Sequence, residues 1–189
     1  MRVILASKSP RRRELVGEIV SDFEIITCEV DESVESGVHP REAVEILAVR
    51  KGRAVADTVG DCAMVVSSDT LVELDGVALG KPRDEDDAFN MLSALSGRRH
   101  NVHTGVAVHY LGRVFSGVAT TAVYFKPATP EEIWGYIATG DPMDKAGGYG
   151  IQSGGGRFVE KYEGDYDTVV GLSVSLTKEL MRRAGYDEE

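Results

Sequence analysis

The stretch that decides the fold class is VSSDTLVELDGVALGKP, residues 66–82. Asp75 and Gly76 are typical of a two-residue hairpin turn, and short apolar runs lie on both sides of them. This pattern predicts two adjacent antiparallel strands. The rest of the chain mixes strand-like and helical segments, which favours crossover connections between parallel strands. Together, the hairpin and the crossovers predict an α/β fold with a mixed β-sheet.

Apolar runs, turn residues and helix caps on either side of the hairpin predict the other elements. Further strands are expected at 3–6, 23–27, 62–67, 101–110 and 113–125. Helices are expected from Ser9-Pro10, from Pro40 to about 57, at 84–96, from Thr129 to about 140, and in a last segment ending near 184. An acidic tail, 187–189, closes the chain.

Two groups of residues resemble metal ligands, but a structural role explains both. The acidic run 84–87 begins a predicted helix, where carboxylates are stabilised by the helix dipole, so we interpret it as a cap. His100 and His103 lie three residues apart on a predicted strand, which turns them to opposite faces. A zinc site at these histidines is therefore not expected.

Composition limits the possible function classes. Of the 189 residues, 42% are hydrophobic and 28% are charged, which is typical of a globular protein, and one domain over 1–189 is expected. The net charge of −10 argues against nucleic acid and anionic membranes as partners. Two cysteines, Cys28 and Cys62, lack CxxC spacing and are expected to be buried free thiols in a reducing compartment.

The N-terminus shows no targeting segment. Its first apolar run, 3–6, has four residues, whereas a signal peptide needs about 7–15 and a membrane span about 20. We therefore expect a cytoplasmic protein.

Two features favour a small anionic ligand. Arg11, Arg12 and Arg13 lie in the first turn of a predicted helix, where cations oppose the helix dipole but free N–H groups can bind an anion. Arg13 could still be a bystander on the outer face. Lys51 interrupts the apolar stripe of the predicted helix from Pro40, so it either snorkels to solvent or faces something anionic.

A glycine-rich segment, 145–152, reads KAGGYGIQ. A flexible loop is one interpretation. However, the segment also contains Lys145, an aromatic residue and an amide, which a linker does not need. Close approach of the backbone to a ligand explains the glycines better.

Several blocks of the sequence, in order and over nearly the whole chain, resemble the Maf nucleotide pyrophosphatases. They are ILASKSPRRREL (4–15), SSDTLV (67–72), LGKP (79–82), LSGRRHNVHTGVAV (95–108), KAGGYGIQ (145–152) and VVGL (169–172). The resemblance implies an inosine-triphosphate-pyrophosphatase-like fold, in which a bent mixed sheet with flanking helices forms two lobes around a nucleotide cleft. It also implies a homodimer that hydrolyses a nucleoside triphosphate to the monophosphate and pyrophosphate with a divalent metal.

The resemblance also implies roles for single residues. Asp69 corresponds to the catalytic carboxylate that accepts a proton from water. Glu32 and Asp69 correspond to metal ligands. The residues that correspond to phosphate-binding positions are Ser7, Ser9, Arg11, Arg12, Lys51, Lys81 and Lys145. Oxygen ligands without a His or Cys cluster suit Mg²⁺ or Mn²⁺.

Specificity follows from the same resemblance. Arg12, Thr70 and Gln152 match the positions that distinguish the branch acting on dTTP and UTP. Three departures flank the expected cleft: Ser153 and Ser173 replace the usual glycine and proline, and Asp167 stands where many members have asparagine. The alternatives are a pyrophosphatase for other or modified nucleotides and a nucleotide-responsive binding protein that affects septum formation.

Overall fold

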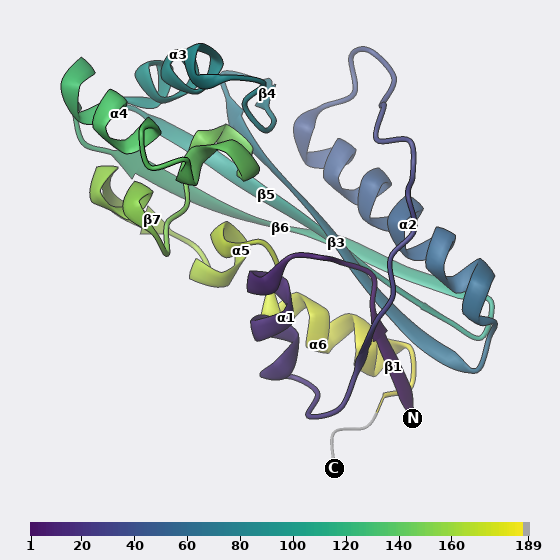
Figure 1. Cartoon of the computed structure of the whole chain (residues 1–189). Coiled ribbons are helices and arrows are strands. Elements are labelled where there is room, and N and C mark those ends of the chain that lie inside the picture. Colours follow the sequence, from purple (N-terminus) through teal and green to yellow (C-terminus); the bar gives the residue numbers. More distant parts are fainter. Residues whose placement is uncertain (187–189) are drawn as a thin grey trace.

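The computed structural model describes residues 1–186, so the acidic tail lies outside the described residues. Its strands are β1 (Arg2–Leu5), β2 (Glu24–Ile25), β3 (Ala63–Leu74), β4 (Val77–Leu79), β5 (Arg99–Tyr110), β6 (Arg113–Phe125) and β7 (Val159–Glu163). These described strands form one long, twisted sheet in the order β2-β1-β3-β5-β6-β7, with β4 also paired to β3 (Figure 1).

Helices cover both faces of the sheet. They are α1 (Pro10–Gly17), α2 (Pro40–Val59), α3 (Glu85–Leu95), α4 (Pro130–Ile137), α5 (Tyr166–Val170) and α6 (Val174–Arg183). Short 3-10 helices follow α4: η1 (Asp141–Asp144), η2 (Ala146–Gly148) and η3 (Gly154–Phe158). No helix within residues 1–186 combines the length and the apolar character needed to cross a membrane.

The predicted hairpin and the mixed sheet are confirmed. Asp75 and Gly76 have φ angles of +53° and +81°, as a two-residue hairpin turn of this kind requires. β3 pairs antiparallel with β4 and β5 but parallel with β1. The fold class is therefore α/β with a mixed sheet.

Some segments differ from the sequence-based predictions. The strand expected at 23–27 is reduced to the exposed pair Glu24–Ile25. The single last helix is divided into α5 and α6, because Gly171 adopts φ +132° and ends α5. β7 has no counterpart among the predicted strands. Both cysteines are free, but Cys62 is exposed in the turn before β3 and Cys28 is half-buried, so the prediction of two buried thiols is wrong.

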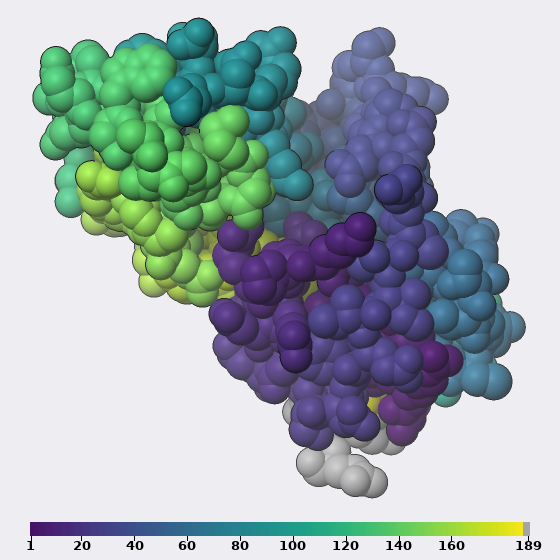
Figure 2. Space-filling model, in the orientation of Figure 1, coloured from purple at the N-terminus to yellow at the C-terminus, as the bar shows by residue number. Residues whose placement is uncertain are grey.

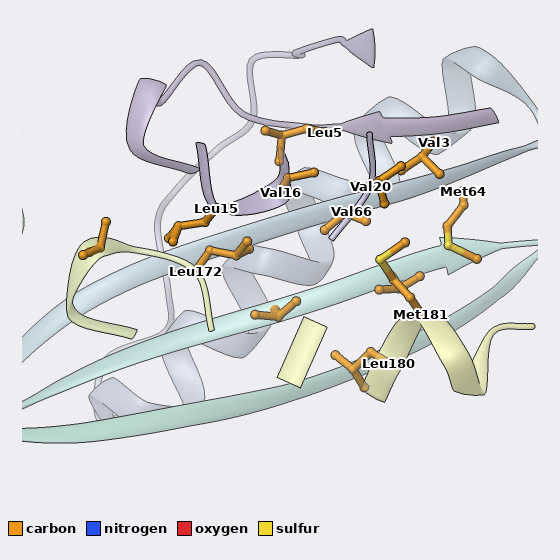
Figure 3. Packing of buried hydrophobic residues seen from close by; sticks show 13 residues of the cluster. Val3, Leu5, Leu15, Val16, Val20, Met64, Val66, Leu172, Leu180 and Met181 are labelled. Atoms are coloured by element: carbon orange, nitrogen blue, oxygen red, sulfur yellow. The ribbon is translucent and has the colours of Figure 1, made fainter. Parts of the chain in front are cut away.

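Two of the three hydrophobic clusters among the described residues form the cores of the two predicted lobes. One lies between the first half of β3, β1, α1 and α6, and Figure 3 shows it from close by. The other lies between the second half of β3, α3 and α4. Met64 and Val66 belong to the first core, and Val72 and Leu74 to the second. One strand thus runs through both cores. One domain over residues 1–189 stays a prediction.

The middle of β3 lies between the two cores. On the side away from β5, β1 pairs with residues 63–66 and β4 with residues 72–74. Residues 67–71 therefore have a free edge within the described sheet. The molecular surface is hollowed between the two lobes (Figure 2).

α2 packs very closely on the sheet. A Cβ atom on Gly52 would overlap the side chain of Ser67, and one on Gly105 would overlap the backbone of α2. Ser67 Oγ also donates a hydrogen bond of 2.7 Å to the Ala48 carbonyl. The two glycines thus let α2 lie directly against β3 and β5, which determines where Lys51 can reach.

Candidate active site

A cleft with a volume of about 1230 Å³ lies at the middle of β3, between the two lobes. Segments from both lobes line it, including the loop before α1, α2, and the chain from η1 to residue 153. All the predicted site residues line this one cleft: Ser7, Ser9, Arg11, Arg12, Glu32, Lys51, Asp69, Thr70, Lys81, Lys145 and Gln152. The fold thus brings together residues that are far apart in the sequence.

Asp69 is nearly buried and faces α2. From α2, Lys51 donates a hydrogen bond of 2.5 Å to Asp69 Oδ1, and its Nζ lies 2.8 Å from Glu32 Oε1. The hydrogen bond from Lys51 lowers the pKa of Glu32, which keeps that carboxylate ionised near neutral pH. Lys51 therefore does not snorkel to solvent, since it joins two carboxylates at the cleft.

Serine hydroxyls shape the loop between β1 and α1. Ser9 is the N-cap of α1, and its Oγ accepts a hydrogen bond of 3.5 Å from the Arg12 N–H. Ser7 Oγ accepts from the Ser9 N–H at 3.2 Å and from Arg12 Nη1 at 3.5 Å. The start of α1 lines the cleft, so its free N–H groups are suited to an anion.

Arg12 is held from two elements. Its Nε donates to the Gly171 carbonyl at 2.8 Å, and its Nη2 donates to Thr70 Oγ at 3.3 Å. Burial lowers the pKa of Arg12, but a guanidinium stays protonated in proteins. Arg12 is therefore a fixed cation at the wall of the cleft.

The two neighbouring arginines take different positions. Arg11 Nη1 lies 3.6 Å from Asp144 Oδ2, which belongs to the other lobe, so this ion pair crosses the cleft. Arg13 is exposed and does not line the cleft. Of the two alternatives for Arg13, the outer-face bystander is the one that the structure supports.

Lys145 is held by two carboxylates that the sequence reasoning missed. Its Nζ lies 2.9 Å from Asp141 Oδ1 and 2.6 Å from Asp144 Oδ1. Asp141 Oδ2 also accepts hydrogen bonds of 2.6 Å from Tyr136 and from Ser153. Burial alone raises the pKa of Asp141, but the hydrogen bonds from Ser153, Tyr136 and Lys145 outweigh burial and lower it. The four-residue spacing between Asp141 and Lys145 is the sequence signal that could have indicated their contact.

Lys81 and Gln152 line the cleft with exposed side chains. Neither side chain makes a hydrogen bond or ion pair with another residue of the described chain. Close by, Gly147 adopts φ +68°, and a Cβ atom there would overlap Val72. The glycine-rich segment therefore packs against β3, which excludes the flexible-linker interpretation.

Glu32 and Asp69 fit the chemistry of a hard divalent cation. Both carboxylates contact Lys51 Nζ, so they converge on one place in the cleft. Within residues 1–186, no three or more His, Cys, Asp or Glu side chains are grouped to hold a metal. Mg²⁺ commonly binds through one or two carboxylates, with substrate phosphates and water completing its ligands. The donor set fits an ion that arrives with a nucleotide.

The other groups that resemble metal ligands make contacts within the fold, and the predicted helix cap at 84–87 is confirmed. Asp84 caps α3 by accepting a hydrogen bond of 2.7 Å from the Asp87 N–H. His100 Nε2 lies 2.8 Å from Tyr149 Oη, whereas His103 contacts Thr120 and a glutamate. The two histidines therefore have separate partners.

Comparison with known proteins identifies the family. Residues 2–184 match the family model described as Maf-like protein. The chain belongs to the Maf family. It is 48% identical over 188 residues to the dTTP/UTP pyrophosphatase of Moorella thermoacetica, covering 98% of this chain and 96% of that protein. It is 46% identical over 184 residues to the dTTP/UTP pyrophosphatase of Thermococcus onnurineus, covering 97% and 98%.

Among solved structures, this Maf chain is similar to the Ham1 protein of Staphylococcus aureus. The TM-score is 0.47 at 16% sequence identity, and the match covers 66% of this chain and 72% of that chain.

The departures from the usual Maf pattern have different surroundings. Ser153 lines the cleft and donates to Asp141. Asp167 and Ser173 do not line it but stabilise the turn from α5 to α6. Asp167 Oδ2 accepts from the Val174 N–H at 2.7 Å, and Ser173 is the N-cap of α6. These two residues thus support the Gly171 turn that holds Arg12, without reaching the cleft themselves.

Proposed function

We propose that this Maf chain hydrolyses dTTP and UTP to the nucleoside monophosphate and pyrophosphate, with a divalent metal. One observation carries the proposal. In a chain with a net charge of −10, the cleft gathers several cations around a nearly buried acid, Asp69. The cations are Arg11, Arg12, Lys51, Lys81 and Lys145. A triphosphate requires such a concentration of positive charge, and the names of the relatives at 46–48% identity support the substrates.

The reaction requires a nucleophile, a base and stabilised charge. Water attacks the α-phosphorus, the bond from that phosphorus to the oxygen shared with the β-phosphorus breaks, and pyrophosphate leaves. Asp69 accepts the proton of the attacking water. Lys and Arg side chains around the cleft stabilise the charge that develops on the phosphate oxygens. The α–β position of cleavage follows from the family resemblance.

Glu32 and Asp69 would hold the Mg²⁺ or Mn²⁺, since nucleotide pyrophosphatases are typically metal-dependent. A bound ion supplies positive charge at the phosphates and lowers the pKa of its bound water. Lys51 contacts both carboxylates in this structure, and its single positive charge offsets only one of the two negative charges. The metal and Lys51 would compete for the same carboxylate oxygens of Glu32 and Asp69. We therefore expect Lys51 to exchange these contacts for phosphate oxygens when metal and nucleotide bind.

Arg12, Thr70 and Gln152 would form the pocket for the base. The Gln152 side chain carries a donor and an acceptor on one amide, and it has no competing partner among the described residues. The edge of thymine or uracil presents an N3–H between two carbonyls, so an amide can pair with it. Cytosine lacks that hydrogen and carries a 4-amino group.

A panel of nucleoside triphosphates tests the function. Purified protein should release pyrophosphate from dTTP and UTP well ahead of CTP, ATP, GTP and 7-methyl-GTP, with Mg²⁺ or Mn²⁺ but not with EDTA. Release of orthophosphate from dTTP would contradict cleavage between the α- and β-phosphates. Nucleotide binding without turnover under all metal conditions would favour a binding protein.

Two family-based expectations accompany the proposal. If the protein is a homodimer, light scattering should give about twice the 20.4 kDa mass of one chain. A cytoplasmic location is predicted to appear on cell fractionation, and recovery of the protein in membranes would contradict it.

A further inference from the structure

A chain of hydrogen bonds continues from the proposed base pocket into the sheet. Thr104 on β5 is directly opposite Thr70 on β3 and is fully buried. Thr104 Oγ donates a hydrogen bond of 2.7 Å to the Thr168 carbonyl in α5, and it lies 2.9 Å from Thr70 Oγ. On the cleft side, Arg12 Nη2 donates to Thr70 Oγ at 3.3 Å.

The direction of each hydrogen bond follows from the number of hydrogens. A carbonyl only accepts, so the single hydroxyl hydrogen of Thr104 points to Thr168. Thr104 Oγ can then only accept, which makes Thr70 the donor between the two threonines. The Gly171 carbonyl is a poorer partner for Thr70, because it lies 3.4 Å away and already accepts two shorter hydrogen bonds. Thr70 is thus left as an acceptor toward the cleft, where Arg12 donates to it.

We propose that Thr104 is a positioning residue for base selection, which rests on the function proposed above. By holding the Thr70 hydroxyl as an acceptor, Thr104 fixes the guanidinium of Arg12. An arginine has five N–H donors, and three of those on Arg12 are occupied by Gly171, Thr70 and Ser7. The two N–H groups that remain can bind the ligand, and they can act only as hydrogen-bond donors.

Fixed donors distinguish the pyrimidine bases. The 4-carbonyl of thymine or uracil accepts from an arginine, whereas the 4-amino group of cytosine is itself a donor. A donor facing a donor leaves both groups unpaired, which penalises CTP. Without the Thr104 hydroxyl, the Thr70 hydroxyl would lose its 2.9 Å partner, so its oxygen would be held less firmly and the guanidinium of Arg12 could move away from an amino group. Loss of the Thr104 hydroxyl should therefore favour CTP relative to dTTP.

Substitution of Thr104 tests the proposal. Thr104→Val removes the hydroxyl at nearly the same shape, and we expect the ratio of kcat/KM for dTTP to that for CTP to fall about tenfold, the effect of one lost hydrogen bond. Thr104→Ser keeps the hydroxyl and should restore the ratio. The matched control is Thr121→Val, since Thr121 is also fully buried and donates at 2.8 Å to the Asp165 carbonyl, next to the same helix, without touching Thr70.

Three results would overturn the proposal: an unchanged ratio in Thr104→Val, an equal change in Thr121→Val, or no rescue by Thr104→Ser. The ratio of the dissociation constants for dTTP and CTP, measured by calorimetry in an Asp69→Asn background, provides the same comparison without turnover. Wild-type protein that binds dTTP selectively but hydrolyses neither dTTP nor UTP would contradict the proposed function alone, and the binding ratio would still decide the role of Thr104. Equal binding of dTTP and CTP by wild-type and Thr104→Val protein would contradict base selection by this network.

Discussion

The cleft contains two lysines that are held in almost the same way, one on each lobe. Lys51 contacts one shielded carboxylate, Asp69, and one exposed carboxylate, Glu32, with side-chain exposures of 11% and 64%. Lys145 contacts Asp141 and Asp144, with side-chain exposures of 25% and 66%. Charge and burial alone therefore do not distinguish the two groups.

The two groups differ in how many hydrogen bonds the shielded acid already accepts. Asp141 accepts from Tyr136, Ser153 and Lys145. Asp69 has one partner among the described residues, Lys51. A carboxylate offers about four lone-pair sites, so Asp69 has spare capacity for a metal or a water and Asp141 has little. The free lone pairs of Asp69 therefore support Asp69, and not Asp141, as the proposed proton acceptor.

The largest expected effect is at Asp69. Asp69→Asn should lower turnover by about 10²–10⁴-fold, because an amide cannot accept the proton of water. Nucleotide binding, measured by calorimetry, should remain. Asp141→Asn is the matched control. Its turnover should fall by less than about tenfold, because Asp141 holds Lys145 and is not proposed to accept a proton from water. Equal losses in the two variants, or more than about a tenth of wild-type activity in Asp69→Asn, would remove the distinction between the acids.

Lys81 sharpens the comparison because it is a cleft lysine whose side chain makes no hydrogen bond or close ion pair within residues 1–186, although its charge helps to lower the pKa of Glu32. Lys81→Ala should lower kcat/KM for dTTP by about tenfold or more, the range for a hydrogen bond to a charged group. The melting temperature should change little, since the side chain is exposed. Lys126→Ala, at an exposed lysine outside the cleft, is the control. Normal kinetics with a lower melting temperature would indicate a structural role for Lys81.

Gln152 tests whether the Lys145 side of the cleft reads the base. Gln152→Glu removes the amide donor and adds a charge, so the preference for dTTP and UTP over CTP should fall by about five- to tenfold, near the lower end of the cost of an unpaired polar group. Steady-state kinetics on the three nucleotides provide the ratios. Unchanged ratios would show that Gln152 does not contact the base.

The smallest effect is on stability, and it depends on pH. The hydrogen bonds of Asp141 hold its pKa below the unfolded value of about 3.9, so their stabilisation is complete above that pH and is lost as the pH falls through the lower folded pKa. Asp141→Asn should lower the free energy of unfolding by about 1–3 kcal/mol at pH 7. Urea unfolding at pH 3 should show a smaller difference from wild type. An equal difference at both pH values would mean that the charge of Asp141 contributes nothing.

The sequence predicts the Lys51 side of the cleft more completely than the Lys145 side, for a physical reason. Lys51 interrupts an apolar helical stripe, so local periodicity marks it, and Asp69 belongs to a block that resembles the Maf family. Asp141 instead begins a 3-10 helix, where an acidic residue is unremarkable. Its role depends on Tyr136 and Ser153, which tertiary packing alone brings to it.

The fold shows the same division between local and long-range information. The hairpin at Asp75 and Gly76 and the helix start at Thr129 are local signals, and both are confirmed, the second by a capping box between Thr129 and Glu132. The strand β7 has no such signal, because four of its five residues are exposed and it forms only by pairing with β6. The split between α5 and α6 likewise depends on one positive φ angle at Gly171, which composition does not reveal.

The passage of β3 through both hydrophobic cores has a consequence for cooperativity. Because each core includes part of this strand, melting one lobe would remove a wall of the other. We therefore expect one calorimetric transition with equal van't Hoff and calorimetric enthalpies. The cleft lies at the middle of the same strand, so a nucleotide that binds there should raise the midpoint of that whole transition by mass action. In this architecture, binding of the substrate should therefore stabilise the whole fold against heat and proteolysis, and not only a single loop.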